Sequence, residues 1–325
     1  MISGPHQPGS CPRGYYLRVS VTEACAYRCA YCQPDGPVAQ GRSGLAPEQL
    51  EALVAALTRV GVHRVRLTGG EPLSRRDCPE IVERLARLPG LAEVALTTNG
   101  QRLRPMAAAL AEAGLSRLNV HLDSLDPRRH HEITGHDDHA EVLAGIDAAE
   151  AAGLPPPKIN VVVMRGVNDD ELAAFCEHAA ATGRTVRFIE LMDTGIAARW
   201  SREHLVTAAE IRERIAAHFE LQPRFADRGA SPAQEYLLDG GRATVGIIAS
   251  ESEPFCERCN RLRLTVKGEL RGCLYEAGGV PLLPHLEDPA RLGEVIARGV
   301  AGKRSHHPTA GEVEANRFSM AAIGG

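Results

Sequence analysis

Short apolar runs alternate with longer amphipathic runs over the first two-thirds of the chain, and this alternation limits the folds that the chain can adopt. The apolar runs have the length of β-strands, and the amphipathic runs space their apolar residues as helices do. Strands are predicted at Tyr16–Val21, Val62–Thr68, Glu93–Thr97, Arg117–Leu122, Lys158–Val163 and Thr185–Glu190. Helices are predicted at Pro47–Val60, Leu103–Ala113, Ala140–Ala152 and Asp169–Thr182. Because a helical crossover joins neighbouring parallel strands, the alternation predicts a parallel sheet.

The number of β/α units predicts an open barrel. Six units are fewer than the eight that close a barrel of the triosephosphate-isomerase type, so we expect an α/β fold with a partial (β/α)6 barrel. The alternation weakens after about Gly195. A helix is then predicted at Thr207–Phe219, and short strands are predicted near Tyr236, at Thr244–Ile248 and at Leu262–Val266. We therefore divide the chain into a barrel domain at residues 1–230 and a C-terminal region at residues 231–325.

Three cysteines follow the first predicted strand with the spacing C-x3-C-x2-C, at Cys25, Cys29 and Cys32. A 4Fe–4S cluster usually takes four Cys ligands, so three would leave one iron without a protein ligand. An open iron can bind a substrate or cofactor, much as catalytic zinc sites keep one position open. The alternative interpretation is a zinc site that a distant His or Cys completes.

A second group of three cysteines has the spacing C-x2-C-x13-C, at Cys256, Cys259 and Cys273. It indicates either a second 4Fe–4S cluster with an open iron or a zinc ribbon completed by a histidine. Arg261 and Arg263 lie between these cysteines on a predicted strand, where alternate residues share a face. Guanidinium groups bind phosphates through paired hydrogen bonds, so this segment favours a phosphorylated ligand.

Composition limits the partners. With 37 Lys and Arg against 41 Asp and Glu, the chain is mildly acidic and a poor general binder of nucleic acid. No run of about 18 apolar residues predicts a membrane span. The N-terminal segment lacks the apolar core of a signal peptide, so we expect a cytoplasmic protein. In that compartment, nine cysteines are not expected to form a disulfide framework.

Some metal-binding residue types fall outside these motifs. Cys11, Cys78 and Cys176 lack cluster spacing, and we interpret them as core or incidental residues. The histidines between His130 and His139 are interpreted as a solvated loop rather than as a metal site.

Gly69-Gly70-Glu71-Pro72 follows the second predicted strand, where glycines let the backbone approach a ligand closely. Together with the C-x3-C-x2-C spacing, this stretch resembles the radical S-adenosylmethionine superfamily. The resemblance implies that S-adenosylmethionine chelates the open iron and that one electron cleaves it to a 5′-deoxyadenosyl radical. It also implies that Tyr31 lies near the adenine and that the glycine stretch contacts the methionine amino group.

Further segments, in order, make the resemblance more specific. They are Leu17–Thr22, Leu96–Gly100, Lys158–Asn160, Arg187–Met192, Phe255–Arg263 and Ile323–Gly325. Together they resemble the GTP 3′,8-cyclase family of molybdenum-cofactor biosynthesis over nearly the whole chain. The implied fold is the partial barrel of radical S-adenosylmethionine enzymes, with a C-terminal extension that carries a second iron–sulfur cluster. The alternatives are a peptide-modifying radical enzyme with an auxiliary cluster, and a zinc-ribbon binding protein.

The resemblance to the cyclase family implies a role for each matching residue. The two cysteine groups would hold two 4Fe–4S clusters. The S-adenosylmethionine site would be lined by Tyr31, Gly70, His121 and Met192. GTP would be held by Arg18, Arg66, Thr97, Lys158, Arg261, Leu262 and Arg263. Gly324 and Gly325 would reach into the active site and take part in catalysis. At the position of His121 the family usually has a serine, so the contact there stays open.

The resemblance also implies the reaction and its partners. The radical would abstract hydrogen from C3′ of the GTP ribose, and C3′ would then attack C8 of guanine. The product would be (8S)-3′,8-cyclo-7,8-dihydroguanosine 5′-triphosphate, which cyclic pyranopterin monophosphate synthase would use next. A donor such as flavodoxin or ferredoxin would supply electrons, and the chain could form a homodimer. Neither nucleic acid nor a membrane is an expected partner.

Overall fold

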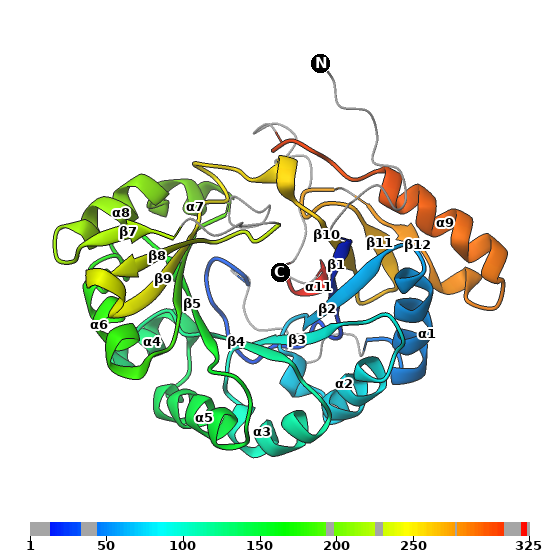
Figure 1. The fold of residues 1–325 in the computed structure, drawn as a ribbon, viewed down its shortest axis with the longest axis horizontal. Helices are drawn as coiled ribbons and strands as arrows, with labels where there is room; N and C mark the ends of the chain where they lie inside the picture. Colours follow the sequence, from blue (N-terminus) through cyan, green and yellow to red (C-terminus); the bar gives the residue numbers. More distant parts are fainter. Residues whose placement is uncertain are drawn as a thin grey trace.

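The computed structural model describes residues 14–33, 44–192, 198–224, 230–276, 278–308 and 320–323. A twelve-stranded sheet runs through these ranges and curves into an arc (Figure 1). Its centre is a run of parallel strands, namely β1 (Tyr15–Ser20), β2 (Val62–Thr68), β3 (Glu93–Thr98), β4 (Arg117–His121), β5 (Lys158–Val163) and β6 (Val186–Glu190). These strands confirm the parallel sheet predicted from the alternation.

Strands from the C-terminal part of the chain extend both edges of this arc. They are β7 (Leu221–Pro223), β8 (Gln234–Leu238), β9 (Ala243–Ile248), β10 (Arg261–Leu264), β11 (Glu269–Arg271) and β12 (Val280–Pro281). Strand β9 pairs in parallel with β6, and β10 pairs in parallel with β1. Beyond them the pairing turns antiparallel, and the two ends of the sheet do not pair with each other. The barrel is therefore partial, as predicted, and the division at residues 230 and 231 stays a prediction.

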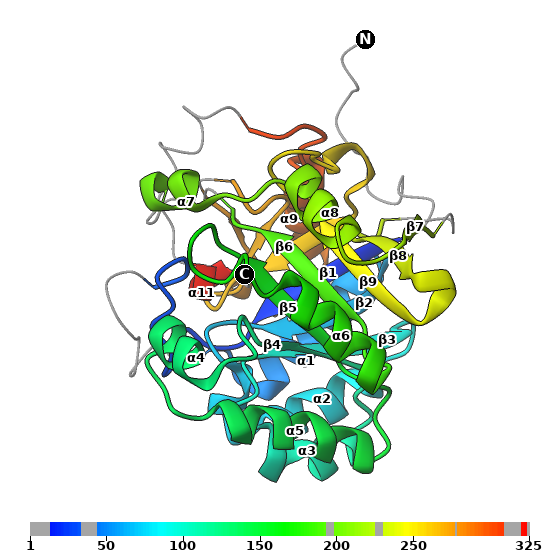
Figure 2. The same cartoon turned by 90° about the vertical axis from the view of Figure 1, so that its left-hand side faces the viewer.

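Helices cover the convex face of the arc, as Figures 1 and 2 show. They are α1 (Pro47–Thr58), α2 (Cys78–Ala86), α3 (Leu103–Glu112), α4 (Pro127–Thr134), α5 (His139–Ala151), α6 (Leu172–Thr182), α8 (Ala208–Ala216) and α9 (Pro289–Ala301). The shorter helix α7 (Ala198–His204) lies at one end of the barrel, and α11 (Met320–Ile323) lies inside the arc.

The core lies between the helices and the sheet. Helix α1 buries Leu50, Leu53 and Leu57, whose spacing puts them on one side of the helix. Against such stripes pack alternate strand residues, for example Leu17 and Val65. Because this layer takes the outward-facing side chains, the residues between them on the same strands face the interior of the arc.

Helix α4 corrects one expectation from the sequence. The sequence predicts a solvated loop for its histidines, but Asp126 caps the helix by accepting from the N–H groups of Arg128 and Arg129, with Pro127 in the first turn. His130 on this helix is 2 % exposed, and His139 at the start of α5 is 8 % exposed. The interpretation was wrong because the burial of these histidines comes from long-range packing, which the local polarity hides.

The isolated cysteines fit the interpretation given to them where the structure describes them. Cys78 and Cys176 are fully buried in the core, and Cys11 lies outside the described residues. In the ranges that the structure describes, no helix combines the length and apolar character needed to cross a membrane.

Candidate active site

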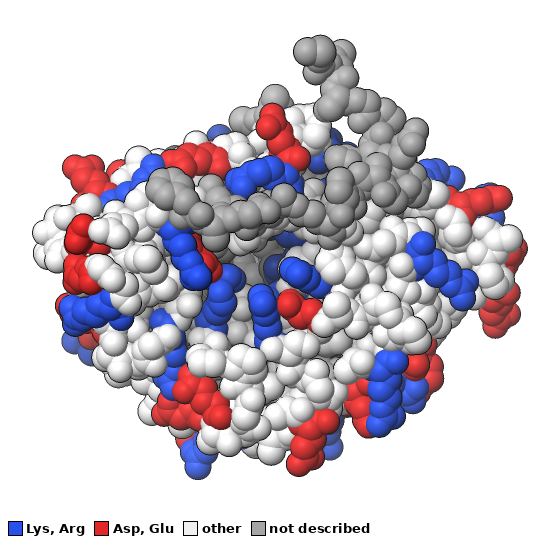
Figure 3. Space-filling model, viewed as in Figure 1, with Lys and Arg blue, Asp and Glu red and all other residues white. Residues whose placement is uncertain are grey.

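One cavity inside the arc is lined by both cysteine groups. It has a volume of about 370 Å³, and Figure 3 shows the hollow with basic side chains around it. Cys25, Cys29 and Cys32 reach it from the segment after β1, and Cys256, Cys259 and Cys273 reach it from the segments around β10 and β11. We call these the first triad and the second triad. Because β10 pairs with β1, the fold itself brings the two triads to one cavity.

The two glycines after β2 hold the segment that carries the first triad. The Gly70 N–H donates to Thr22 O at 2.7 Å, and the Glu71 N–H donates to Ala24 O at 2.7 Å. A Cβ built on Gly70 would lie 2.3 Å from Ala24 O, and Gly69 has a φ of +143°. The close approach that requires glycine here is therefore made by the protein's own backbone, while both glycines still line the cavity.

Glu71 closes the corner between β2 and β3. Its buried carboxylate accepts from the Leu73 N–H at 2.8 Å, from Thr98 Oγ1 at 2.7 Å and from the Asn99 N–H at 2.7 Å. Burial raises the pKa of Glu71 to about 6, although these hydrogen bonds favour the charged form. An acidic group is thus fixed beside the first triad, next to Asn99, whose amide lies 3.9 Å from Cys25 Sγ.

Asp123 fixes the other side of the first triad. It accepts a hydrogen bond of 2.6 Å from the Tyr31 hydroxyl through Oδ2, and one of 2.7 Å from the Val162 N–H through Oδ1. Asn168 holds the backbone of Asp123 by donating to its carbonyl oxygen at 2.7 Å. Tyr31, which lies directly before Cys32, is thereby tied to β5.

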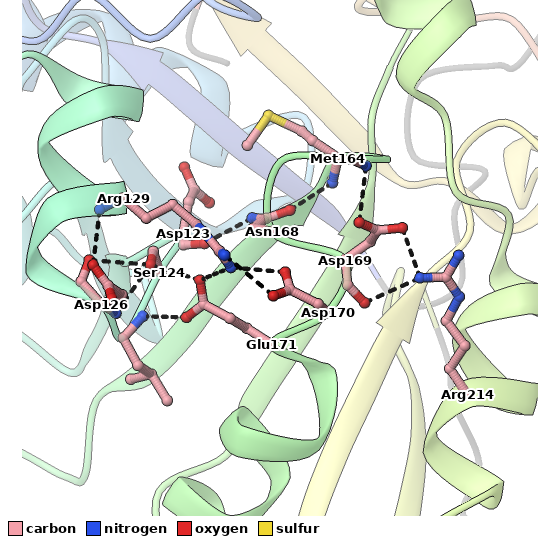
Figure 4. Close-up of polar contacts among 12 residues, drawn as sticks. Asp123, Ser124, Asp126, Arg129, Met164, Asn168, Asp169, Asp170, Glu171 and Arg214 are labelled. Carbon is pink, nitrogen blue, oxygen red and sulfur yellow. Dashed lines mark hydrogen bonds and ion pairs between the residues drawn. The ribbon is translucent and has the colours of Figure 1, made fainter.

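A wider polar network supports Asp123 (Figure 4). Glu171 accepts from Ser124 Oγ at 2.7 Å and from the Leu125 N–H at 2.7 Å. Arg129 on α4 pairs with Glu171 at 2.6 Å and with Asp170 at 2.7 Å. The network ties the segment after β4 to the segment after β5. It therefore helps to hold Asp123, at the start of the first of these segments, in place.

The buried histidines belong to a second support for the first triad. Asp138 Oδ1 accepts from the Tyr27 hydroxyl at 2.9 Å and lies 2.9 Å from His130 Nε2, while Gln101 donates to Oδ2 at 2.9 Å. Burial alone would raise the pKa of Asp138, but these hydrogen bonds keep it below its ordinary value. Asp138 therefore anchors Tyr27, which lies between Cys25 and Cys29, to α4.

The second triad has cationic neighbours. Arg261 Nε donates to Cys259 Sγ at 3.3 Å, and Lys303 Nζ lies 3.6 Å from the same sulfur. Burial alone would raise the pKa of Cys259, but the charges of Arg261 and Lys303 lower it to about 6. In the first triad the balance is reversed, because burial raises the pKa of Cys25 to about 12 and that of Cys32 to about 11.

The cavity consequently has an acidic side and a basic side. Glu71 and Asp123 lie beside the first triad. The basic side is lined by Arg18, Arg66, Arg187, Arg261 and Arg263. Burial, followed by repulsion from neighbouring guanidinium groups, lowers the pKa of Arg18 well below its ordinary value and that of Arg263 to about 10. An anion bound here would relieve that repulsion.

Most residues that the resemblance assigned to ligands line this cavity. For S-adenosylmethionine these are Tyr31, Gly70, His121 and Met192, and for GTP they are Arg18, Arg66, Thr97, Arg261 and Arg263. Arg66 is oriented by bonds to the Tyr16 hydroxyl at 2.5 Å and to Thr97 Oγ1 at 3.1 Å.

Two residues of the expected GTP site lie elsewhere. Lys158 is not among the lining residues and forms an ion pair of 3.4 Å with Glu235. Leu262 is fully buried in the core, on the opposite face of β10 from the two arginines beside it. Gly324 and Gly325 lie outside the described residues, and the helix before them ends at Ile323, whose carbonyl accepts from Arg263 at 3.3 Å.

Several lining residues have no role in the predictions made from the sequence. Tyr16, Asn119, Asn160 and Arg187 all face the cavity from parallel strands. The signal for them was the two-residue period of each strand, because every second residue faces the interior of the arc. Lys303 lies in a polar stretch of the sequence, and no local pattern marks it as part of a site.

Comparisons with known proteins agree with this geometry. Residues 19–179 match the Radical SAM superfamily, and residues 184–309 match the Molybdenum Cofactor Synthesis C family. A GTP 3′,8-cyclase of Stenotrophomonas maltophilia (strain K279a) is 45 % identical over 285 residues, which cover 87 % of each chain. The GTP 3′,8-cyclase of Geobacter sulfurreducens is 42 % identical over 315 residues, covering 95 % of this chain and 96 % of that one.

The chain belongs to the GTP 3′,8-cyclase family. The first match covers the end of β1 and all of β2 to β5, and the second covers β6 and the strands that extend the sheet. Among solved structures, that of Streptococcus suis SuiB bound to S-adenosylmethionine has a TM-score of 0.58 at 13 % identity, covering 81 % of this chain and 60 % of SuiB. At that identity the likeness shows the fold alone.

Proposed function

We propose that this chain is a GTP 3′,8-cyclase of molybdenum-cofactor biosynthesis, and that it uses radical S-adenosylmethionine chemistry. One observation carries the proposal. Two groups of three cysteines line one cavity, with acidic residues beside the first and arginines beside the second. This arrangement suits two ligands of opposite charge that must meet.

The cysteines fit two 4Fe–4S clusters. Each triad offers three thiols, and the other described cysteines, Cys78 and Cys176, are buried in the core away from the cavity. No described group of three such side chains converges closely enough for a single metal ion. In a cubane each thiolate binds a different iron, so its ligands need not converge on one point. When bound, the first cluster and S-adenosylmethionine supply a 5′-deoxyadenosyl radical.

The acidic side of the cavity suits S-adenosylmethionine, because its sulfonium is a cation. Glu71 and Asp123 would stabilise that charge, while Tyr31, Gly70, His121 and Met192 would line the site. His121 Nδ1 is buried and has no hydrogen-bond partner in the described part of the chain, so it is available to a ligand.

The basic side suits the triphosphate of GTP. Arg18, Arg66, Arg261 and Arg263 would bind phosphate or base oxygens through charge-assisted hydrogen bonds. Thr97 would keep Arg66 in place and meet the nucleotide beside it. We include Lys158, which would exchange Glu235 for a phosphate, and Leu262, which would contribute its backbone.

The remaining partners follow from the proposed reaction. The enzyme would act in the cytoplasm as a monomer or a homodimer, and would take electrons from a donor such as flavodoxin or ferredoxin. Cyclic pyranopterin monophosphate synthase would consume its product. Gly324 and Gly325 are proposed to enter the cavity beside the substrate.

The test is anaerobic incubation of the reconstituted protein with GTP, S-adenosylmethionine and a reductant, followed by mass spectrometry. We expect 5′-deoxyadenosine and a cyclised isomer of GTP, and protein with about eight irons. Cys273→Ser should lose the second cluster and form no cyclised product. Colourless protein with stoichiometric zinc, or a loaded enzyme that leaves GTP unchanged, would contradict the proposal.

A further inference from the structure

Lys303 is a buried lysine placed against the second triad. It follows α9 by two residues and is 6 % exposed. Its Nζ lies 2.9 Å from Arg261 O, 3.2 Å from Gly272 O and 3.6 Å from Cys259 Sγ. An ammonium group has three N–H donors, so these three acceptors use all of them.

The backbone around the second triad is shaped to admit this lysine. A Cβ built on Gly272 would lie 2.7 Å from Lys303 Cα and 2.9 Å from Lys303 N. Any larger residue directly before Cys273 would therefore push Lys303 away. The Gly272 N–H donates to Glu276 Oε2 at 2.7 Å, which fixes the glycine from its other side. Lys303 therefore packs between the segment that carries Cys259 and the segment that carries Cys273.

The charge of Lys303 also needs a partner. A buried ammonium is costly unless it is paired. Among the described residues, the contacts of the Lys303 ammonium are two carbonyl oxygens and one sulfur, with no carboxylate. The groups near it that can carry a negative charge are the sulfurs of the second triad: Cys259 in direct contact, and Cys256 close enough for the charge of Lys303 to act on it. Metal ligands of this kind are thiolates, so a cluster ligand at Cys259 would supply the missing charge.

We propose that Lys303 is a positioning residue for the second cluster, holding Cys259 Sγ and the carbonyl groups of Arg261 and Gly272 so that the triad is ready to bind it. This inference rests on the proposed function, because it requires a cluster at the second triad. The contacts of Lys303 orient a ligand from outside the first coordination sphere, as hydrogen-bond partners of metal ligands do. Its positive charge offsets the negative charge of the thiolates.

The inference is tested by the rate at which a chelator removes iron from anaerobically reconstituted protein. Lys303→Met keeps the length of the side chain but removes its charge and donors. We expect iron of the second cluster to leave about tenfold faster or more, because losing such a partner of a metal ligand typically weakens metal affinity by about 10- to 100-fold. Iron of the first cluster should leave at the wild-type rate. The Cys273→Ser variant, which is expected to hold only the first cluster, gives that rate separately. Lys303→Arg, which keeps the charge, should release iron more slowly than Lys303→Met.

The matched control is Lys267→Met, which removes an exposed lysine from the turn between β10 and β11. It should match the wild type. Equal release from the Lys303→Met variant and the wild type would overturn the inference. So would loss of both clusters together with the circular-dichroism signal of folded protein, since Lys303 would then be merely structural. Wild-type protein with only about four irons would instead contradict the proposed function.

Discussion

Single residues of the cavity carry polar atoms that the described protein does not satisfy. His121 Nδ1, Asn160 Oδ1 and Arg187 Nε are buried and lack a hydrogen-bond partner in the described ranges. Buried polar atoms are normally hydrogen-bonded, so each such atom calls for an explanation. All three residues line the same cavity, and a bound ligand supplies one explanation for all of them.

His121 is one of these three residues. Burial lowers the pKa of His121, so at neutral pH its imidazole is uncharged. His121→Leu should weaken S-adenosylmethionine binding about 3- to 10-fold, the effect of one lost hydrogen bond. The dissociation constant of S-adenosylmethionine, measured at equilibrium for the variant and the wild type, tests this expectation.

The stability of the same variant is the control. His121→Leu should unfold at the wild-type temperature or higher, because it removes an unsatisfied buried atom. Unchanged affinity would show that this position tolerates substitution and does not contact the ligand.

Residue types and spacing singled out six cysteines in two groups, and the structure brings both groups to one cavity, while their role as cluster ligands stays a prediction. Spacing could not predict Lys303, which lies 30 residues beyond Cys273 in a polar segment. Helix α9 packs against β11 and β12, and this packing places Lys303, just after the end of the helix, beside the second triad. Long-range packing of this kind leaves no local signal.

At the scale of elements, the loops that follow β4 and β5 depend on each other. Asn168 donates to Asp123 O at 2.7 Å and to Val162 O at 2.9 Å, and accepts from the Met164 N–H at 2.7 Å. Figure 4 shows Asn168, in the loop after β5, pointing towards Asp123 in the segment after β4. Asn168→Ala would leave these buried groups without their partner. We expect a loss of about 1–3 kcal/mol in the free energy of unfolding, measured with denaturant.

The neighbouring Asp170 provides the comparison for Asn168. Its side chain is 66 % exposed and pairs with Arg129 at the surface, where an ion pair contributes little. Asp170→Ala should therefore leave the free energy of unfolding nearly unchanged. If Asn168→Ala and Asp170→Ala lower the free energy of unfolding by the same amount, the buried hydrogen bonds of Asn168 do not hold the two loops together.

Helix α8 gives a pH-dependent prediction. Glu210 accepts from the Thr207 N–H at 2.9 Å and from Arg165 at 2.7 Å, and these hydrogen bonds lower its pKa to about 2. Because the folded-state pKa lies below the ordinary 4.5, the charged form stabilises the helix above about pH 4.5, and this contribution is lost as pH falls towards 2.

Glu210→Gln should accordingly reduce stability at pH 7 by about 0.3–1 kcal/mol, the usual value of a charge at a helix N-terminus. The difference from the wild type should shrink as the pH falls through that window. Thermal unfolding at several pH values measures it. A difference that is the same at pH 7 and at pH 3 would contradict the assignment.

Elements could be predicted where a local pattern determines them. Strands β1 to β6 and helices such as α1 follow from apolar periodicity. Helix α4 was not predicted because it is polar along most of its length. Its buried His130 packs against Tyr27, which belongs to a segment far away in the sequence. The parallel pairing of β9 and β10 with the barrel strands is a contact between distant parts of the chain, which short β-like runs do not reveal.

At the scale of the whole molecule, the sheet brings the C-terminal part of the chain to the cavity. Helix α11 lies inside the arc, where buried Ile323 packs with Leu274 and Tyr275 (Figure 1). The residues that follow are Gly324 and Gly325, for which we predict a role in the reaction. Deleting both should abolish product formation but leave the iron content of both clusters unchanged. Full activity of the shortened protein would exclude that role.

We propose that S-adenosylmethionine and GTP meet in one cavity between two clusters. The most direct test is an anaerobic reaction with GTP that carries deuterium at C3′ of the ribose, followed by the mass of the 5′-deoxyadenosine formed. We expect the 5′-deoxyadenosine to carry the deuterium and a cyclised isomer of GTP to accumulate with it. Formation of 5′-deoxyadenosine without deuterium, while GTP stays unchanged, would contradict the claim.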